Sequence, residues 1–259
     1  MNQEKRILVC EDSMEGIFSA VYDGWKECAD GCKVSIQTSF PVSMELFTSY
    51  REIATDQSKA GKVMRTILMR LGSEVYEQIC LAAASADEDR GTAIYYVLHR
   101  AFWGGRCEKR VMEALADPYV SRVAKLALCV KREYHHYFGF VRFREISGRF
   151  LLAKIQPGND ILSLMALHFS NRFPNENWVI YDEKRQKALC HEKGKECVMR
   201  KGVRIQVPGS AVGDMGEYEE LWQTFCDSIS IEARRNEKLQ KQMLALHFRS
   251  NMPEFSVKG

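Results

Sequence analysis

The chain has 259 residues, of which 46% are hydrophobic and 27% charged, and its formal net charge at pH 7 is +3. This composition is typical of a globular protein and excludes an intrinsically disordered one. No apolar run reaches the roughly 18 residues that a membrane-spanning helix needs. The apolar stretch near the N-terminus is too short for a secretion signal. We therefore expect a cytoplasmic protein with no membrane partner.

Positive charge is concentrated between residues 100 and 149, where eleven lysines and arginines stand beside five aspartates and glutamates. The rest of the chain carries a net negative charge. A local basic patch on a nearly neutral protein fits a nucleic-acid contact. It fits an acidic protein partner equally well.

The nine cysteines are scattered, and no two of them form a C-x-x-C pair. A secreted disulfide framework is therefore not expected. Two groupings, Cys28 with Cys32 and Cys190-His191 with Cys197, have spacings that match no standard metal-binding signature. We interpret them as reduced thiols and predict neither a metal site nor a cofactor.

The first fifty residues predict a small β-α-β unit. Residues 6–10 read as a strand, residues 14–28 as an amphipathic helix and residues 33–37 as a second, parallel strand. The turn after the first strand lacks the glycine fingerprint of a nucleotide-binding loop. Glu11 and Asp12 in that turn are candidate Mg²⁺ ligands, but helix capping and solvent exposure are the favoured interpretation.

Residues 43–137 are expected to be almost continuous helix with short breaks, as in an antiparallel bundle. Asp56, Ser73 and Asp117 are the predicted N-terminal caps. The last of these helices carries an apolar stripe that ends near Tyr137, with basic residues such as Lys131 and Arg132 off the stripe.

Gly139 is predicted to end that helix, because the sequence alternates with a period of two beyond it. Arg142 and Arg144 would then project side by side from a hairpin that turns at residues 147–148 and returns over 150–156. Forked guanidinium groups suit phosphate oxygens. The alternative is a solvated face on which arginines pair with glutamates such as Glu145.

The remaining chain predicts a helix over residues 161–169, strands over 178–181 and 187–191, and short strands between 198 and 207. Further helices are expected over residues 218–248. The predicted fold class is α+β: an N-terminal β-α-β unit (1–52), a helical region (53–137) and an antiparallel sheet with flanking helices (138–259). The last two parts could share one core.

Six segments between about Tyr95 and Glu254 carry a family resemblance: Lys131-Arg-Glu-Tyr-His135, Gly139-Phe-Val-Arg-Phe-Arg-Glu145, His168-Phe-Ser-Asn-Arg-Phe173, Asn177-Trp-Val-Ile180, Glu219-Glu-Leu-Trp222 and Ile231-Glu-Ala-Arg-Arg-Asn-Glu-Lys-Leu-Gln240. The segment Glu11-Asp-Ser-Met-Glu-Gly16 also looks like the longer members. With these segments in order, the chain resembles a bacterial family of probable DNA metabolism proteins whose biochemical activity is unknown.

The resemblance implies an association with a radical-SAM enzyme thought to modify or repair DNA. It also implies kinship with domains that are fused to uracil-DNA-glycosylase-like domains. The chain has no C-x-x-x-C-x-x-C triad, so we do not expect the radical chemistry in it. Family members usually carry a Met-Pro-x-x-Tyr-Trp segment where this chain has Met243-Leu-Ala-Leu-His247-Phe248, so a partner contact made by that tail would differ here.

Three functions are compatible with these patterns. The first is a DNA-binding accessory protein in DNA metabolism or repair, and its phosphate contacts would give a steep salt dependence. The predicted phosphate-binding residues are Lys131, Arg132, Arg142, Arg144, Arg172 and Arg234. The second is a DNA-processing enzyme, glycosylase- or nuclease-like, and the third is a protein-docking module without DNA contact.

In the enzyme hypothesis, His135 is the general acid or base and either Glu133 or Glu145 orients it. A histidine near carboxylates is a weak signature, because single histidines are commonly structural. The sequence has no nucleophile elbow and no deaminase zinc motif. We therefore expect binding rather than catalysis.

Overall fold

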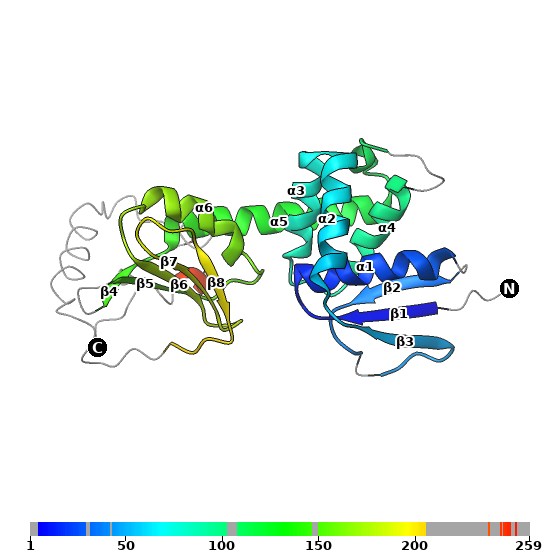
Figure 1. The fold of residues 1–259 in the computed structure, drawn as a ribbon, viewed down its shortest axis with the longest axis horizontal. Coiled ribbons are helices and arrows are strands. Elements are labelled where there is room, and N and C mark those ends of the chain that lie inside the picture. The colour runs from blue at the N-terminus through cyan, green and yellow to red at the C-terminus, as the bar shows by residue number, and fades with distance from the viewer. Residues whose placement is uncertain are drawn as a thin grey trace. The chain divides into compact units, whose positions relative to one another are not determined.

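The structure is a computed structural model that describes residues 5–29, 32–41, 43–102, 108–146, 150–205, 238, 244, 246–249 and 252. The chain divides into two compact units, Met1–Arg132 and Glu133–Gly259. The predicted α+β class is confirmed: the first unit has a parallel three-stranded sheet and the second a five-stranded, mostly antiparallel sheet (Figure 1). Within the described ranges, no helix has the length and apolar character that crossing a bilayer requires.

The predicted β-α-β unit is confirmed by β1 (Lys5–Cys10), α1 (Met14–Ala29) and β2 (Lys33–Gln37), with β1 and β2 parallel. A third strand, β3 (Thr48–Ile53), pairs in parallel with the other side of β1. The expectation of helix from residue 43 onward is wrong for this segment. Most β3 side chains are at least partly exposed, so the strand carries little apolar alternation in its sequence.

The described part of the first unit continues with helices: α2 (Gln57–Leu71), α3 (Ser73–Ala83), α4 (Arg90–Phe102), a 3₁₀ turn (Val111–Glu113) and α5 (Pro118–Phe140), which continues into the second unit. The carboxylate of Asp56 accepts hydrogen bonds from the first turn of α2, and that of Asp117 from the first turn of α5, as predicted. Ser73 is not a cap. It is the first residue of α3, and Gly72, with φ of 96°, precedes it as the N-cap.

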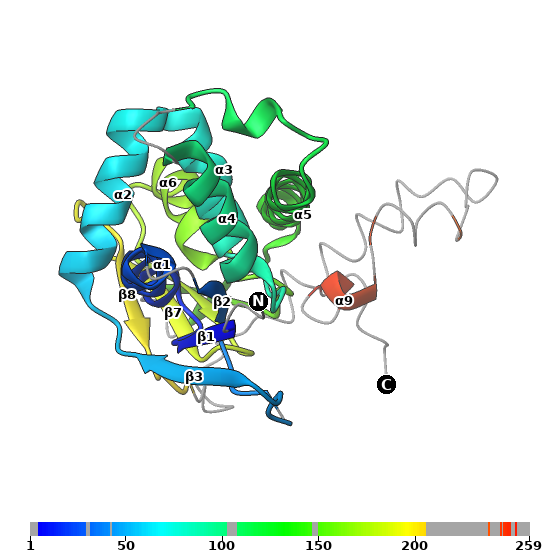
Figure 2. The same cartoon turned by 90° about the vertical axis from the view of Figure 1, so that its right-hand side faces the viewer.

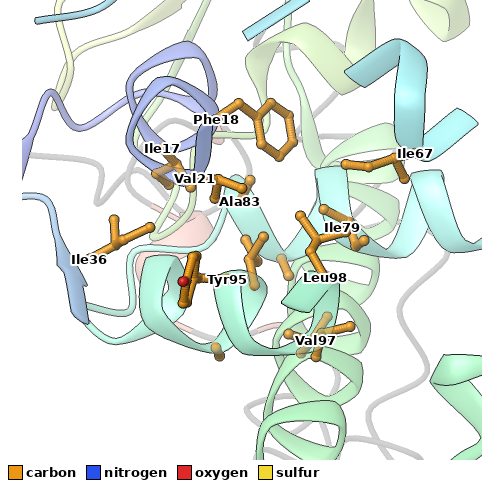
Figure 3. Close-up of a cluster of buried hydrophobic side chains, with 14 of the residues drawn as sticks. Ile17, Phe18, Val21, Ile36, Ile67, Ile79, Ala83, Tyr95, Val97 and Leu98 are labelled. Atoms are coloured by element: carbon orange, nitrogen blue, oxygen red, sulfur yellow. The ribbon is translucent and has the colours of Figure 1, made fainter. Parts of the chain in front are cut away.

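One hydrophobic core joins the three-stranded sheet to these helices (Figure 3). It brings together Ile36 of β2, Phe18 of α1, Ile67 of α2 and Tyr95 and Leu98 of α4, all of them buried. Each buried side chain of this size contributes about 1.5–3 kcal/mol through removal of apolar surface from water. The strands and helices of the first unit therefore fold around a common core.

Helix α4 covers the outer edge of β2, and Figure 2 shows the two elements next to each other. The hydroxyl of Thr92 accepts a hydrogen bond from the Ile36 backbone N–H (2.9 Å) and donates one to the Ile36 carbonyl (3.0 Å). The helix can approach this closely because residue 91 is glycine: a Cβ there would lie 2.7 Å from Cγ2 of Ile36. Capturing the free backbone groups of an edge strand prevents pairing with another chain.

The sheet of the second unit has the order β4-β5-β6-β7-β8. Its elements are β4 (Arg144–Ile146), β5 (Phe150–Ile155), α6 (Leu162–Arg172), β6 (Trp178–Asp182), β7 (Lys187–His191) and β8 (Val198–Lys201), and α9 (Leu246–Arg249) follows later in the chain. The predicted antiparallel sheet is found, except that its neighbouring strands β5 and β6 are parallel. Because α6 connects them, the chain crosses over and enters β6 in the same direction as β5.

The junction between α5 and β4 also differs from the prediction. Helix α5 continues past Gly139 to Phe140, and β4 begins only at Arg144. Gly139 lacks positive φ and is exposed, so nothing there forces the helix to end. Arg142 consequently lies before the strand, and its guanidinium donates to the Gly139 carbonyl (2.8 Å) near the end of α5. The predicted turn at residues 147–148 and the predicted helix at 218–231 lie outside the described residues.

Candidate nucleic-acid interface

The predicted basic residues do not form a single row. Arg144 is exposed at the start of β4, whereas Arg142 lies in the irregular segment before it, so the two do not share a strand face. Arg172 is the last residue of α6, and its guanidinium carbon lies 5.6 Å from the centroid of the Phe173 ring. Arg234 lies outside the described residues.

Lys131 and Arg132 are exposed on the part of α5 that belongs to the first unit. The ammonium group of Lys131 lies 3.4 Å from the carboxylate of Glu77 on α3. Both residues are more than a third exposed, so this ion pair contributes little to stability. Lys131 and Arg132 remain accessible to solvent and to a partner.

Glu133 anchors a loop rather than a histidine. Its carboxylate accepts hydrogen bonds from the backbone N–H groups of Gly158 (2.6 Å) and Asn159 (3.0 Å) and from the Asn159 side-chain amide. Glu145 is exposed on β4 opposite Leu151. In the described part of the chain, neither carboxylate hydrogen-bonds to His135, so the structure does not bring together the predicted acid–base pair.

His135 instead belongs to a histidine–aromatic cluster, which we define as Tyr134, His135, Phe138 and His168. The imidazole of His135 stacks on Tyr134, with ring centroids 5.2 Å apart, and meets Phe138 edge to face at 5.5 Å. Phe138 stacks on His168 at 3.9 Å with an interplanar angle of 12°. The cluster thus joins α5 to α6 through rings that are about thirty residues apart in sequence.

Burial lowers the pKa of His168, and the positive charges of Arg172 and His135 lower it further. Its Nε2 atom is buried and has no hydrogen-bond partner among the described residues. The imidazole is therefore neutral at pH 7 and offers an uncharged ring to its neighbours. His135 and Arg172 are exposed, so a flat ring of the cluster and a nearby guanidinium group are both accessible to solvent. These groups suit base stacking and phosphate binding.

An aromatic core holds the cluster in place. Phe143 packs edge to face on Phe169 (5.5 Å) and Phe173 (5.4 Å), and Phe169 packs on Trp178 of β6 (6.2 Å). This core fixes α6 beside the sheet, and Phe138 contacts it through Phe169. The segments that carry the family resemblance therefore include the core and, apart from Phe138, the cluster.

The other residues singled out in the sequence have structural partners. His191 stacks on Trp178 at 5.0 Å, and its Nδ1 lies 2.9 Å from the Glu176 carbonyl oxygen. Sγ of Cys197 lies 3.0 Å from Oγ of Ser170. Burial raises the pKa of the Cys190 thiol, which keeps it protonated. The side chain of Cys28 lies outside the described residues.

The turn after β1 is occupied by protein partners. Asp12 forms an ion pair with the buried guanidinium of Arg90, and Glu11 accepts a hydrogen bond from the Thr55 hydroxyl (2.7 Å). Ser13 accepts a hydrogen bond from the Gly16 N–H (3.0 Å) and so caps α1. Across the described ranges, no group of three or more His, Cys, Asp or Glu side chains is arranged to hold a metal ion.

Sequence reasoning missed Tyr134, Phe138 and His168 as site residues. A usable signal was the spacing, since His135 and Phe138 are three apart and His168 and Arg172 four apart, which puts each pair on one helix face. What the sequence did not contain was the contact between the two faces. That contact depends on how α6 packs in the second unit.

The fold and this cluster define an α+β protein whose second unit displays aromatic and imidazole rings, with Arg172 nearby, where α5 contacts α6. The chain matches the family model of a domain of unknown function, DUF4130, over residues 88–254. This match covers more than half of the chain, which belongs to that family. Among curated proteins, no match is found.

Proposed function

We propose that this protein is a DNA-binding accessory factor in DNA metabolism or repair. The observation that carries the proposal is the histidine–aromatic cluster, in which exposed His135 stacks on Tyr134, while His168 is close enough to both His135 and Arg172 for their charges to lower its pKa. Aromatic and imidazole rings stack on bases of single-stranded nucleic acid, and arginine binds phosphate. Arg144, Lys131 and Arg132 supply further exposed positive charge.

A radical-SAM enzyme is the proposed partner, and this part of the proposal rests on the family resemblance. Catalysis by His135 is less well supported than binding. Its proposed orienting residue, Glu133, uses both carboxylate oxygens to hold the loop at residues 158–159. A general base needs a group that fixes its tautomer, and among the described residues no carboxylate hydrogen-bonds to His135.

The test is fluorescence anisotropy of the full-length protein with labelled single- and double-stranded DNA over a salt series. We expect tighter binding to the single strand, because only unpaired bases can stack on the cluster. The double variant Arg144→Ala/Arg172→Ala should flatten the slope of log affinity against log salt by about 1.4, which corresponds to two lost phosphate contacts on a single strand. Tyr134→Leu should weaken binding without changing that slope.

A matched control is Lys193→Ala/Lys195→Ala, which removes two exposed positive charges from the turn between β7 and β8. It should leave the slope unchanged if the contacts are specific to the candidate interface. Absence of binding to either DNA form at low salt contradicts the proposal. If the control flattened the slope of log affinity against log salt equally, the binding would reflect general attraction by net charge and not specific contacts.

A further inference from the structure

A second candidate site lies in the first unit, in a hollow of about 430 Å³ between α1, α2 and α4. None of its residues belongs to the candidate nucleic-acid interface. The residues that line it are Val21, Tyr22, Trp25, Lys26, Lys62, Val63, Thr66, Ile67, Leu98 and Phe102. Its volume is within the range of pockets that hold small molecules.

Aromatic rings form one wall of this hollow. The rings of Trp25 and Phe102 meet edge to face at 6.1 Å, and Trp25 also packs on Tyr95 (6.5 Å) and His99 (5.7 Å). Tyr95 is buried and fixed by a hydrogen bond from its hydroxyl to the Gly24 carbonyl (3.1 Å). Trp25 nevertheless remains 38% exposed. The wall is therefore rigid, apolar and accessible.

Positive charge gathers around Tyr22 at the same place. The ammonium groups of Lys26, Lys59 and Lys62 lie 5.7, 5.9 and 5.7 Å from the centroid of the Tyr22 ring. Lys59 is neutralised by Asp23, whose two carboxylate oxygens lie 2.9 and 2.8 Å away. Lys26 and Lys62 have no carboxylate partner within the described residues.

The remaining carboxylate on this part of α1 is engaged elsewhere. Glu27 is held by Arg6 and by Arg51 (2.6 Å), and its hydrogen bond with Arg6 is the main cause that lowers its pKa. Glu27 thus does not compensate Lys26 or Lys62. Two ammonium groups that lack a carboxylate partner in the described part of the chain, beside an aromatic wall, fit a planar ring that carries an anion.

We propose that this hollow binds a nucleotide, with the base against Trp25 and Phe102 and the phosphate on Lys26 and Lys62. A neutral ring alone would make no ionic contact with the two ammonium groups. A simple anion would leave the aromatic side chains exposed to water. A free nucleotide and the 5′-phosphorylated end of a single strand share the required chemistry. The inference goes beyond the proposed DNA contact, because it uses different residues and needs no polymer.

Isothermal titration calorimetry of the full-length protein tests the proposal with deoxyadenosine monophosphate, deoxyadenosine and inorganic phosphate. We expect saturable binding of the monophosphate and at least tenfold weaker binding of the nucleoside and of phosphate. The variant Lys26→Gln/Lys62→Gln should lower the affinity for the monophosphate about tenfold or more, as expected for lost charge-assisted contacts. It should leave nucleoside binding unchanged. Trp25→Leu should lower the affinity for both the monophosphate and the nucleoside.

The matched control is Arg65→Gln/Lys125→Gln, which removes two exposed positive charges of the same unit that do not line the hollow. An equal loss of affinity in this control, or no saturable binding of the monophosphate and of a 5′-phosphorylated oligonucleotide, overturns the proposal. Comparing that oligonucleotide with its 5′-hydroxyl form distinguishes a strand end from a free nucleotide. Salt-dependent DNA binding that persists in Lys26→Gln/Lys62→Gln shows that the interface in the second unit is separate.

Discussion

At the residue scale, His168 should make the second unit sensitive to acid. Its pKa is lowered in the folded protein, mainly by burial, so the unfolded chain binds the proton more readily. The stability it contributes is therefore present above its unfolded pKa of about 6.5 and is lost as the pH falls through the lower folded value. We expect the melting temperature to drop less between pH 7 and pH 5 in His168→Phe than in the wild-type protein.

Burial also lowers the pKa of His99 in the first unit, so part of the pH dependence should persist in that variant. Histidine-selective NMR separates the two groups, because each ring carbon titrates at its own pH. A His168 resonance that titrates above the free-histidine range would contradict the assignment of a neutral ring. An unchanged pH dependence in His168→Phe would contradict its contribution to stability.

Two glycines offer a matched pair of substitutions. A Cβ at Gly16 would overlap the carbonyl oxygen of Glu11, which belongs to the backbone and cannot turn away. Gly61 lies inside α2, and a Cβ added there would have nothing within 4 Å. We expect Gly16→Ala to lower the free energy of unfolding by about 1–3 kcal/mol. Gly61→Ala should raise it by about 0.4–1 kcal/mol, because alanine restricts the unfolded chain. Urea unfolding measures both changes. An unchanged free energy of unfolding in Gly16→Ala would contradict the packing argument.

At the scale of elements, the carboxylate of Glu133 connects α5 to the loop before α6. Glu133 accepts two backbone hydrogen bonds from Gly158 and Asn159, and charged acceptors make such bonds stronger. Glu133→Gln keeps the size of the side chain but removes its charge. We expect it to lower the free energy of unfolding by about 1–3 kcal/mol. Faster hydrogen exchange at the two amides should accompany it. Glu145→Gln, on the exposed face of β4, is the control that should change neither quantity.

The success of the sequence analysis at this scale depended on how local each signal was. Caps such as Asp56 and Asp117 act within three residues, so sequence alone places them correctly. β3 was missed because its partners are in β1, 43 residues earlier, and most of its side chains are at least partly exposed. The end of α5 was misplaced because Gly139 was taken as a breaker, although its backbone is compatible with helix.

At the scale of the whole molecule, the net charge of +3 conceals two differently built basic regions. In the second unit, Arg172 lies beside the histidine–aromatic cluster, whereas in the first unit Lys26 and Lys62 border an aromatic hollow. The sequence analysis singled out Arg172 and His135 but not Phe138 and His168, since stacking of Phe138 on His168 is a tertiary contact. Composition predicted neither arrangement, because it does not record which helices pack together.

The hydrogen bonds between Thr92 and Ile36 have a consequence for protein synthesis. Their partners are 56 residues apart in sequence, so β2 leaves the ribosome well before the residue that closes its edge. During that interval the β-α-β unit offers unpaired backbone groups to any strand nearby. The emerging polypeptide is therefore most open to mispairing before α4 appears, and the emergence of residue 92 from the ribosome closes this interval.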